Sequence, residues 1–246
     1  VFNVSSTFIN LDELANIETQ STIEDTVSGI ATDTAYNENN PNPLIEIPIN
    51  ISFNLNCELD MIEFNKINLK NTLCQLSLNN GIASIANLST NALGGIVKAD
   101  GNYFVNEENT GAVDMNFRMK NISIEDCSKH LITIQKLAPV TNFCEGKLNT
   151  TFSLKSDINN QLSPIINTVN SSGQLTTNNL TVMNYPVLNK ISEELNMNGL
   201  NQLKLKKVNI NYLIENGLLN IDTFNLNLPQ GVDAKVVGGT EINNEM

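Results

Sequence analysis

The sequence has no tryptophan, a single histidine (His130) and only 5% aromatic residues. Aromatic platforms that stack on bases or sugars are therefore scarce, and any mechanism that needs two imidazoles is excluded. Basic residues are also few, because 14 lysines and arginines stand against 26 acidic residues and give a net charge of −12. This balance argues against a nucleic-acid partner, since binding to the phosphate backbone needs a basic stripe.

Long hydrophobic runs are absent as well, and no stretch approaches the 18 apolar residues of a membrane-spanning helix. Charged residues make up only 16% of the chain, whereas about 25% is average. The missing polarity comes from 43 asparagines and from many serines and threonines. Four cysteines are too few for a disulfide scaffold. Cys57 with Cys74, and Cys127 with Cys144, form disulfides only if their Cα atoms lie within about 7 Å.

One stretch alternates apolar and polar residues without a miss, and its apolar members are Ile45, Ile47, Ile49, Ile51, Phe53, Leu55 and Cys57. A period of two residues predicts a β-strand with one apolar and one polar face. Pro48 belongs to the polar set and favours an edge position for this strand.

Similar alternation follows along most of the remaining chain. It predicts strands over Met61–Asn71 (with a bulge near Lys66), Leu73–Leu78, Ile82–Leu88, Ile96–Val105, Val113–Met119, Leu148–Leu154, Gln174–Val182, Val208–Ile214, Leu218–Leu228 and Val232–Val237. Short turns between consecutive strands are typical of an antiparallel meander. Helical spacing predicts three short helices, over Ser123–Leu137 with Ser123 as its N-cap, Leu162–Val169 and Val187–Leu195.

Composition divides the chain into two parts. Residues 1–43 are acidic and polar and end in an Asn/Pro cluster, so we expect a partly disordered flank with a short helix over Leu11–Ile17, capped by Asn10. Residues 44–246 form the β-rich domain. The predicted fold is mainly β, a long curved antiparallel sheet with a groove or gutter shape and helices at its ends or across one face.

The apolar face of a sheet is either buried against another part of the protein or left open to bind an apolar partner. One interpretation is an open groove whose aliphatic lining suits acyl chains. Its candidate lining residues are Ile47, Ile49, Ile51, Phe53, Leu55, Val113, Met115 and Phe117. The alternative is a structural or adhesive β module with a fully buried core and no lipid groove.

Candidates for chemistry are weak. Cys127 and His130 lie three residues apart, and Cys144 and Glu145 follow, but this spacing matches no zinc motif. We therefore expect no metal, no cofactor, no catalytic residue and no enzymatic activity.

Three segments resemble the AsmA family in the style of Bacteroidetes members: Asn91–Tyr103, Ile134–Leu195 and Ile210–Ile242. Their order carries the resemblance. A Gly-Gly pair follows a strand, a helix ends in Lys-Leu-Ala-Pro, and a Gly-Lys strand comes next. A Ser-Pro helix, a Ser-Gly strand, a short amphipathic helix and an Asn-Gly-Leu hairpin complete the series.

The resemblance implies a protein related to the bridge-like lipid-transfer proteins, whose gutter-shaped sheets carry phospholipid between membranes. It implies a periplasmic location and a role in outer-membrane assembly and lipid homeostasis. It also implies tethering to the inner membrane by an N-terminal anchor that this chain does not contain, and partners among acyl lipids and envelope proteins.

Overall fold

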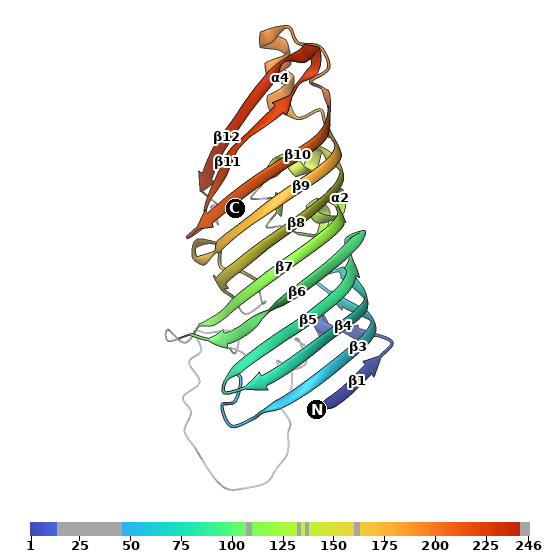
Figure 1. Cartoon of the computed structure of the whole chain (residues 1–246), viewed down its shortest axis with the longest axis vertical. Coiled ribbons are helices and arrows are strands. Elements are labelled where there is room, and N and C mark those ends of the chain that lie inside the picture. The colour runs from blue at the N-terminus through green and yellow to red at the C-terminus, as the bar shows by residue number, and fades with distance from the viewer. Residues whose placement is uncertain (14–45, 107–109, 132–133, 136–137, 160–162, 242–246) are drawn as a thin grey trace, which may run out of the picture.

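The protein is built on one twelve-stranded open sheet, seen in a computed structural model that describes residues 1–13, 46–106, 110–131, 134–135, 138–159 and 163–241 (Figure 1). About 65% of the residues are in strands. The strand order is β1-β3-β4-β5-β6-β7-β8-β9-β10-β11-β12, and β2 also pairs with β3. The sheet is mixed and mostly antiparallel, and it does not close into a barrel.

The strands after the first two run in chain order across the sheet. Their bounds are β3 (Phe53–Phe64), β4 (Ile67–Asn79), β5 (Ile82–Ala92), β6 (Gly95–Val105), β7 (Gly111–Ser123), β8 (Cys144–Asp157), β9 (Asn170–Met183), β10 (Gln202–Glu215), β11 (Leu218–Asn227) and β12 (Asp233–Glu241). The predicted mainly β, antiparallel fold is therefore confirmed, although most strands are longer than their sequence patterns indicate.

The first residues belong to this sheet. β1 (Phe2–Ser6) and β2 (Ile9–Asn10) both pair in parallel with β3, although they fall in the segment that we expect to be a flank. The Asn10 side chain accepts hydrogen bonds from the backbone N–H groups of Asp12 and Glu13, as expected of an N-cap. The rest of the segment up to residue 43, including most of the expected helix Leu11–Ile17, lies outside the described residues.

The predicted strand Ile45–Cys57 is wrong over residues 46–52, and Ile45 lies outside the described residues. β3 begins only at Phe53, and Ile49 and Ile51 are exposed outside any strand. Pro48 is the physical reason, because it cannot donate a ladder hydrogen bond and its carbonyl instead accepts from the Ile51 N–H in a turn. The strand continues past Cys57 to Phe64, and Leu59 and Met61 extend the apolar alternation.

A tight turn, not a bulge, lies near Lys66. Asn65 and Lys66 have φ values of 50° and 62° and join β3 to β4, so the predicted single strand Met61–Asn71 is two strand ends facing each other. Positive φ at both central residues is the type I′ hairpin geometry, whose twist matches that of the flanking strands.

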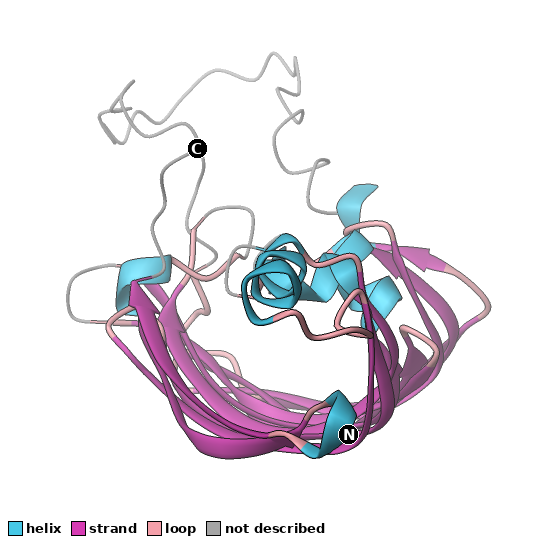
Figure 2. Ribbon diagram, turned by 90° about the horizontal axis from the view of Figure 1, so that it is seen from above, coloured by secondary structure: helices cyan, strands magenta, loops and turns pink. Residues whose placement is uncertain are grey.

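Asparagines with positive φ within the strands contribute to the curvature of this long sheet. Asn71, Asn87 and Asn121 have positive φ within strands, at or next to shifts in strand register. Asn179 has the same conformation within β9. Asparagine tolerates this left-handed conformation better than most residues, and a bulge bends its strand and increases the local twist. These repeated bulges help to bend the sheet into a gutter (Figure 2).

Short helices lie over the concave side of the gutter (Figure 2). They include α2 (Ile124–His130), α4 (Pro186–Leu195) and the 3₁₀ turn η1 (Pro139–Phe143). The 3₁₀ turns η2 (Ile166–Thr168) and η3 (Pro229–Gly231) join β8 to β9 and β11 to β12. The Ser123 hydroxyl caps α2 by accepting from the Asp126 N–H at 3.1 Å, as predicted. α2 ends at His130 and Leu131 is extended, but Ile134 and Gln135 are helical again, so the predicted helix Ser123–Leu137 is interrupted; residues 132–133 and 136–137 lie outside the described residues. In its described part, the predicted helix Leu162–Val169 is only the single turn η2.

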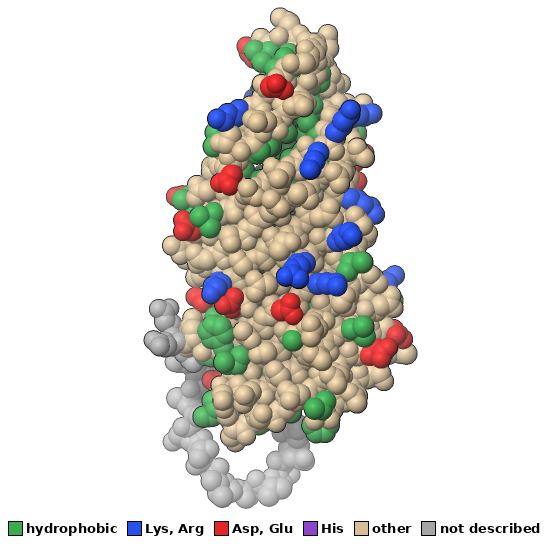
Figure 3. Space-filling view, in the orientation of Figure 1, with side chains coloured by type: hydrophobic (Ala, Val, Ile, Leu, Met, Phe, Trp, Pro, Cys, Tyr) green, Lys and Arg blue, Asp and Glu red, His purple; other side chains and the backbone are tan. Residues whose placement is uncertain are grey.

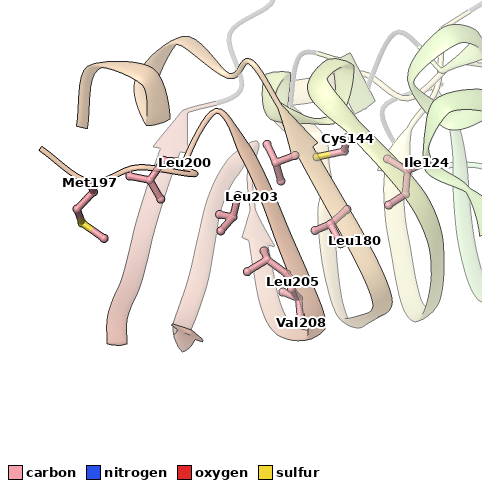
Figure 4. Close-up of a cluster of buried hydrophobic side chains, with 9 residues drawn as sticks. Ile124, Cys144, Leu180, Met197, Leu200, Leu203, Leu205 and Val208 are labelled. Carbon is pink, nitrogen blue, oxygen red and sulfur yellow. The ribbon is translucent and has the colours of Figure 1, made fainter. Parts of the chain in front are cut away.

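Two clusters of buried apolar side chains form the core. The larger lies beneath α2 and η1 on strands β8 to β10 and contains Ile124, Cys144, Leu180, Val182, Met197, Leu200, Leu203, Leu205 and Val208 (Figure 4). The smaller joins η2 to strands β10 and β11 through Ile166, Val169, Ile214 and Leu219. Both clusters involve the later strands, so the packing is densest in the C-terminal half of the sheet.

Candidate functional site

The register places apolar side chains opposite one another from strand to strand. Phe53 pairs with Leu78, and Leu55 pairs with Leu76, which pairs in turn with Ile85. Paired positions share a face of the sheet. Further along the sheet, Met115 pairs with Leu154 and Phe117 with Phe152. One face therefore carries an apolar row across β3 to β8.

This apolar face is the concave one. Leu148 packs against the buried cluster that includes Ile124 of α2, and α2 lies on the concave side (Figure 2). Phe152 and Leu154 follow Leu148 on β8 at intervals of two residues, so they point to the same side. We name the side of the sheet toward which these apolar side chains point the concave face.

Five of the eight predicted lining residues lie on the concave face. Phe53 and Leu55 belong to β3, and Val113, Met115 and Phe117 belong to β7, and all five are partly buried. Ile47, Ile49 and Ile51 do not, because they precede β3, and Ile49 is 79% exposed beside the turn at Gly81. The lining residues of β4, β5, β6 and β8 were not singled out from the sequence, although the same alternation marks them.

Aromatic side chains flank a single glycine in one cross-strand row of the concave face. The rings of Phe117 and Phe152 stack with centroids 4.8 Å apart. Phe152 pairs with Gly173, which pairs with Tyr212 on β10. A Cβ atom at Gly173 would lie 2.6 Å from the Phe152 Cβ and 2.9 Å from the Tyr212 ring, so glycine leaves the space that the two rings occupy.

Cover over the concave face is uneven. The side chains packed around α2, η1 and η2 are buried, among them Ile124, Leu203 and Leu219. On the earlier strands Leu55, Leu76, Ile85, Met115 and Phe117 are only partly buried. The protein thus keeps part of an apolar surface in contact with solvent, on the inside of a curve.

The convex face has the opposite chemistry (Figure 3). Most of its surface is neither hydrophobic nor charged, and lysines and arginine lie mainly toward one margin. Its exposed side chains include Asn54, Asn56 and Asn116. Lys98 and Arg118 are directly paired on β6 and β7, an unfavourable arrangement of like charges. Asp114 and Lys155 form an ion pair at 2.9 Å, the only one among the residues that the structure describes.

All four thiols are free, and the pKa values of Cys74, Cys127 and Cys144 are raised. Cys57 and Cys74 are directly paired across β3 and β4. Burial first, and then the hydrogen bond and the charge of Cys57, raise the pKa of Cys74 to about 12. Burial also raises the pKa of Cys127 and of Cys144 to about 11. Such thiols are poor nucleophiles at neutral pH.

The described part of the chain contains no group of three or more His, Cys, Asp or Glu side chains placed to hold a metal ion. None of its helices is long and apolar enough to cross a membrane. Comparison of the chain with family models, with curated proteins and with solved structures finds no match.

Proposed function

We propose that this chain is a non-enzymatic lipid-binding module that holds or conducts acyl chains along the concave face of its sheet. The observation that carries the proposal is an apolar face left partly exposed on the inside of an open, curved sheet. Apolar surface in water costs free energy, and covering it with an acyl chain recovers about 0.8 kcal/mol per methylene buried.

The distribution of polar and apolar side chains over the two faces of the sheet supports this proposal. An acyl chain needs no hydrogen-bonding partner, and the middle of the concave face offers side chains such as Leu76, Ile85, Met115, Phe117 and Leu154. The convex face is polar and suits contact with water. A sheet that exposes two faces of different chemistry along its length guides an amphiphile with its tail inside and its head group outside.

The AsmA resemblance extends the proposal to a cellular role. On that basis we propose a periplasmic protein that is tethered to the inner membrane outside the present chain, with phospholipid as its ligand and envelope proteins as partners. Its role would be to support outer-membrane assembly and lipid homeostasis.

Two neighbouring residues of β7 provide a matched test. Met115 points to the concave face, whereas Asn116 is exposed on the convex face. Met115→Asp places a carboxylate against the bound acyl chain, which costs several kcal/mol, about enough to lower lipid recovery tenfold or more. Asn116→Asp adds the same charge outside and should leave recovery unchanged. Lipids are extracted from the purified proteins and quantified by mass spectrometry.

A photo-crosslinking residue keeps the test decisive if Met115→Asp fails to fold. We expect Phe117→benzoylphenylalanine to crosslink to an acyl lipid and Asn116→benzoylphenylalanine not to. Equal crosslinking from both positions, or no lipid from any folded variant, would reject the lipid module and favour the structural or adhesive β module.

A further inference from the structure

A pocket of about 680 Å³ lies at the margin of the sheet where the β3–β4 turn, the β5–β6 turn and α2 meet. Four lysines line it, namely Lys66, Lys70, Lys120 and Lys147, together with His130. The only carboxylate in its lining is Asp126, so the lysines leave a net charge of +3 at neutral pH. We name this the rim pocket.

Such a concentration of positive charge is unexpected in this chain. The protein has a net charge of −12 and only 14 basic residues, yet four of them line one pocket. Within the described residues, none of the four ammonium groups has an ion pair or a hydrogen bond to another side chain. Unpaired like charges at one site repel one another, and an anion bound between them removes that repulsion.

The backbone fixes where these charges lie. Lys70 pairs with Asn91, which pairs with Ile96, which pairs with Lys120, so the two lysines lie in one row across four strands. The amide side chains of Asn68, Asn91 and Asn121 also line the pocket and supply neutral donors.

Two unusual turns form part of the pocket wall. Twelve non-glycine residues have positive φ in the described chain, and nine of them are asparagines. Lys66 and Leu93 are two of the three exceptions, and both line the rim pocket. Left-handed conformation at such residues costs about 1 kcal/mol or more. Both of these energetically unfavourable backbone conformations therefore lie in the wall of the pocket that the four lysines line.

The rim pocket touches both faces of the sheet. Ile67 and Ala92 contribute to its lining. Ala92 directly follows Asn91 and Ile67 lies three residues before Lys70, so both point to the side opposite the row of Lys70 and Lys120, which is the concave side. Lys70 and Lys120 lie on the convex side. An anionic group bound here would therefore lie at the end of the apolar surface.

We propose that the rim pocket binds a phosphate group, either the head group of an anionic phospholipid or a free phosphorylated compound. Lysine ammonium groups bind phosphate as point charges, and asparagine amides complete the set of donors. The lipid form of this proposal rests on the proposed function, because it places the head group in the rim pocket and the tail on the concave face.

The experiment uses the full chain and two probes: inorganic pyrophosphate by calorimetry, and vesicles of phosphatidylcholine with or without phosphatidylglycerol by flotation. The pocket variant is Lys70→Gln with Lys120→Gln. The control variant is Lys204→Gln with Lys206→Gln, which removes the same charge from β10, outside the pocket. We expect the pocket variant to weaken pyrophosphate binding roughly tenfold or more, and the control to change it less than about twofold.

Flotation identifies the source of the phosphate. Binding to phosphatidylglycerol vesicles that requires Lys70 and Lys120 supports a lipid head group, and pyrophosphate binding alone supports a free phosphorylated compound. Equal loss in both double variants, or no pyrophosphate binding by the unaltered chain, would overturn the rim pocket as a phosphate site. Lipid recovered with the pocket variant but not with Met115→Asp would preserve the proposed function even then. Conversely, pocket-dependent pyrophosphate binding by a chain that recovers no lipid would reject only the proposed function.

Discussion

Oxidation of the Cys57–Cys74 pair is a sensitive measure of the sheet register. Directly paired positions of antiparallel strands have Cα atoms about 4.5–5.5 Å apart, within the range of roughly 4.4–6.8 Å that a disulfide spans. Diamide accepts two electrons and two protons, so one equivalent converts the two thiols to a disulfide. We expect this bond to form in the folded protein.

The expected stabilisation follows from the length of the closed loop. Residues 57 to 74 make a loop of 18 residues, for which the chain-entropy relation gives about 3 kcal/mol at 25 °C. In a chain of this size that corresponds to a rise in melting temperature of roughly 6–12 °C. Circular dichroism melts of the oxidised and reduced protein measure it.

The reaction should also be slow at neutral pH. A pKa of about 12 leaves Cys74 almost entirely protonated, and the thiolate is the reacting form. Raising the pH from 7 to 9 should therefore speed disulfide formation. Cys57→Ser removes the pair and is the control. If diamide leaves all four thiols of the unaltered protein free for alkylation after unfolding, or if a disulfide forms without raising the melting temperature, the assigned register is wrong.

Three further predictions concern stability. Burial raises the pKa of Cys127 and of Cys144 in the folded protein to about 11. Between about pH 9 and pH 10 the unfolded chain therefore loses these protons before the folded protein does, and the free energy of unfolding should fall by about 1 kcal/mol per thiol at pH 10. Urea titrations of the unaltered chain and of the Cys→Ala variants measure this decline. Gly101→Val should cost more than about 2 kcal/mol because its side chain meets the backbone of β7, whereas Gly238→Val, with open space around it, should change the urea midpoint little. Ser123→Ala removes the α2 cap and should cost about 1 kcal/mol, and a chemical denaturation curve that does not shift would contradict the cap.

The strands were predictable from the sequence because their alternation is regular. The patterns over Ile96–Val105 and Val113–Met119 lie within β6 and β7, and the Ser123 cap also has its predicted partner. The strand over Ile45–Cys57 was misplaced because apolar period alone carries no information about the turn that Pro48 makes. The conformation of this segment is determined by backbone hydrogen bonding and not by the hydrophobic pattern.

The asparagines hold information that the sequence pattern does not reveal. The sequence shows how many asparagines there are, but only the φ values show that Asn71, Asn87 and Asn121 adopt the left-handed conformation within strands. An asparagine that interrupts an otherwise regular apolar and polar alternation is the sequence signal that could have indicated such a bulge. The rim pocket was hidden for a different reason, since Lys66, Lys70, Lys120 and Lys147 are spread over 82 positions of the chain and only the sheet brings them together.

The arrangement of strands in chain order makes the molecule nearly one-dimensional. From β3 onward each strand pairs with the strands before and after it in the chain, so its stability depends chiefly on its immediate neighbours. A hairpin gained or lost by duplication or deletion would change the length of the gutter while leaving distant pairings intact. Lengthening of this kind extends the span of the protein in steps of about 10 Å, because each hairpin adds two strand spacings of roughly 4.8 Å.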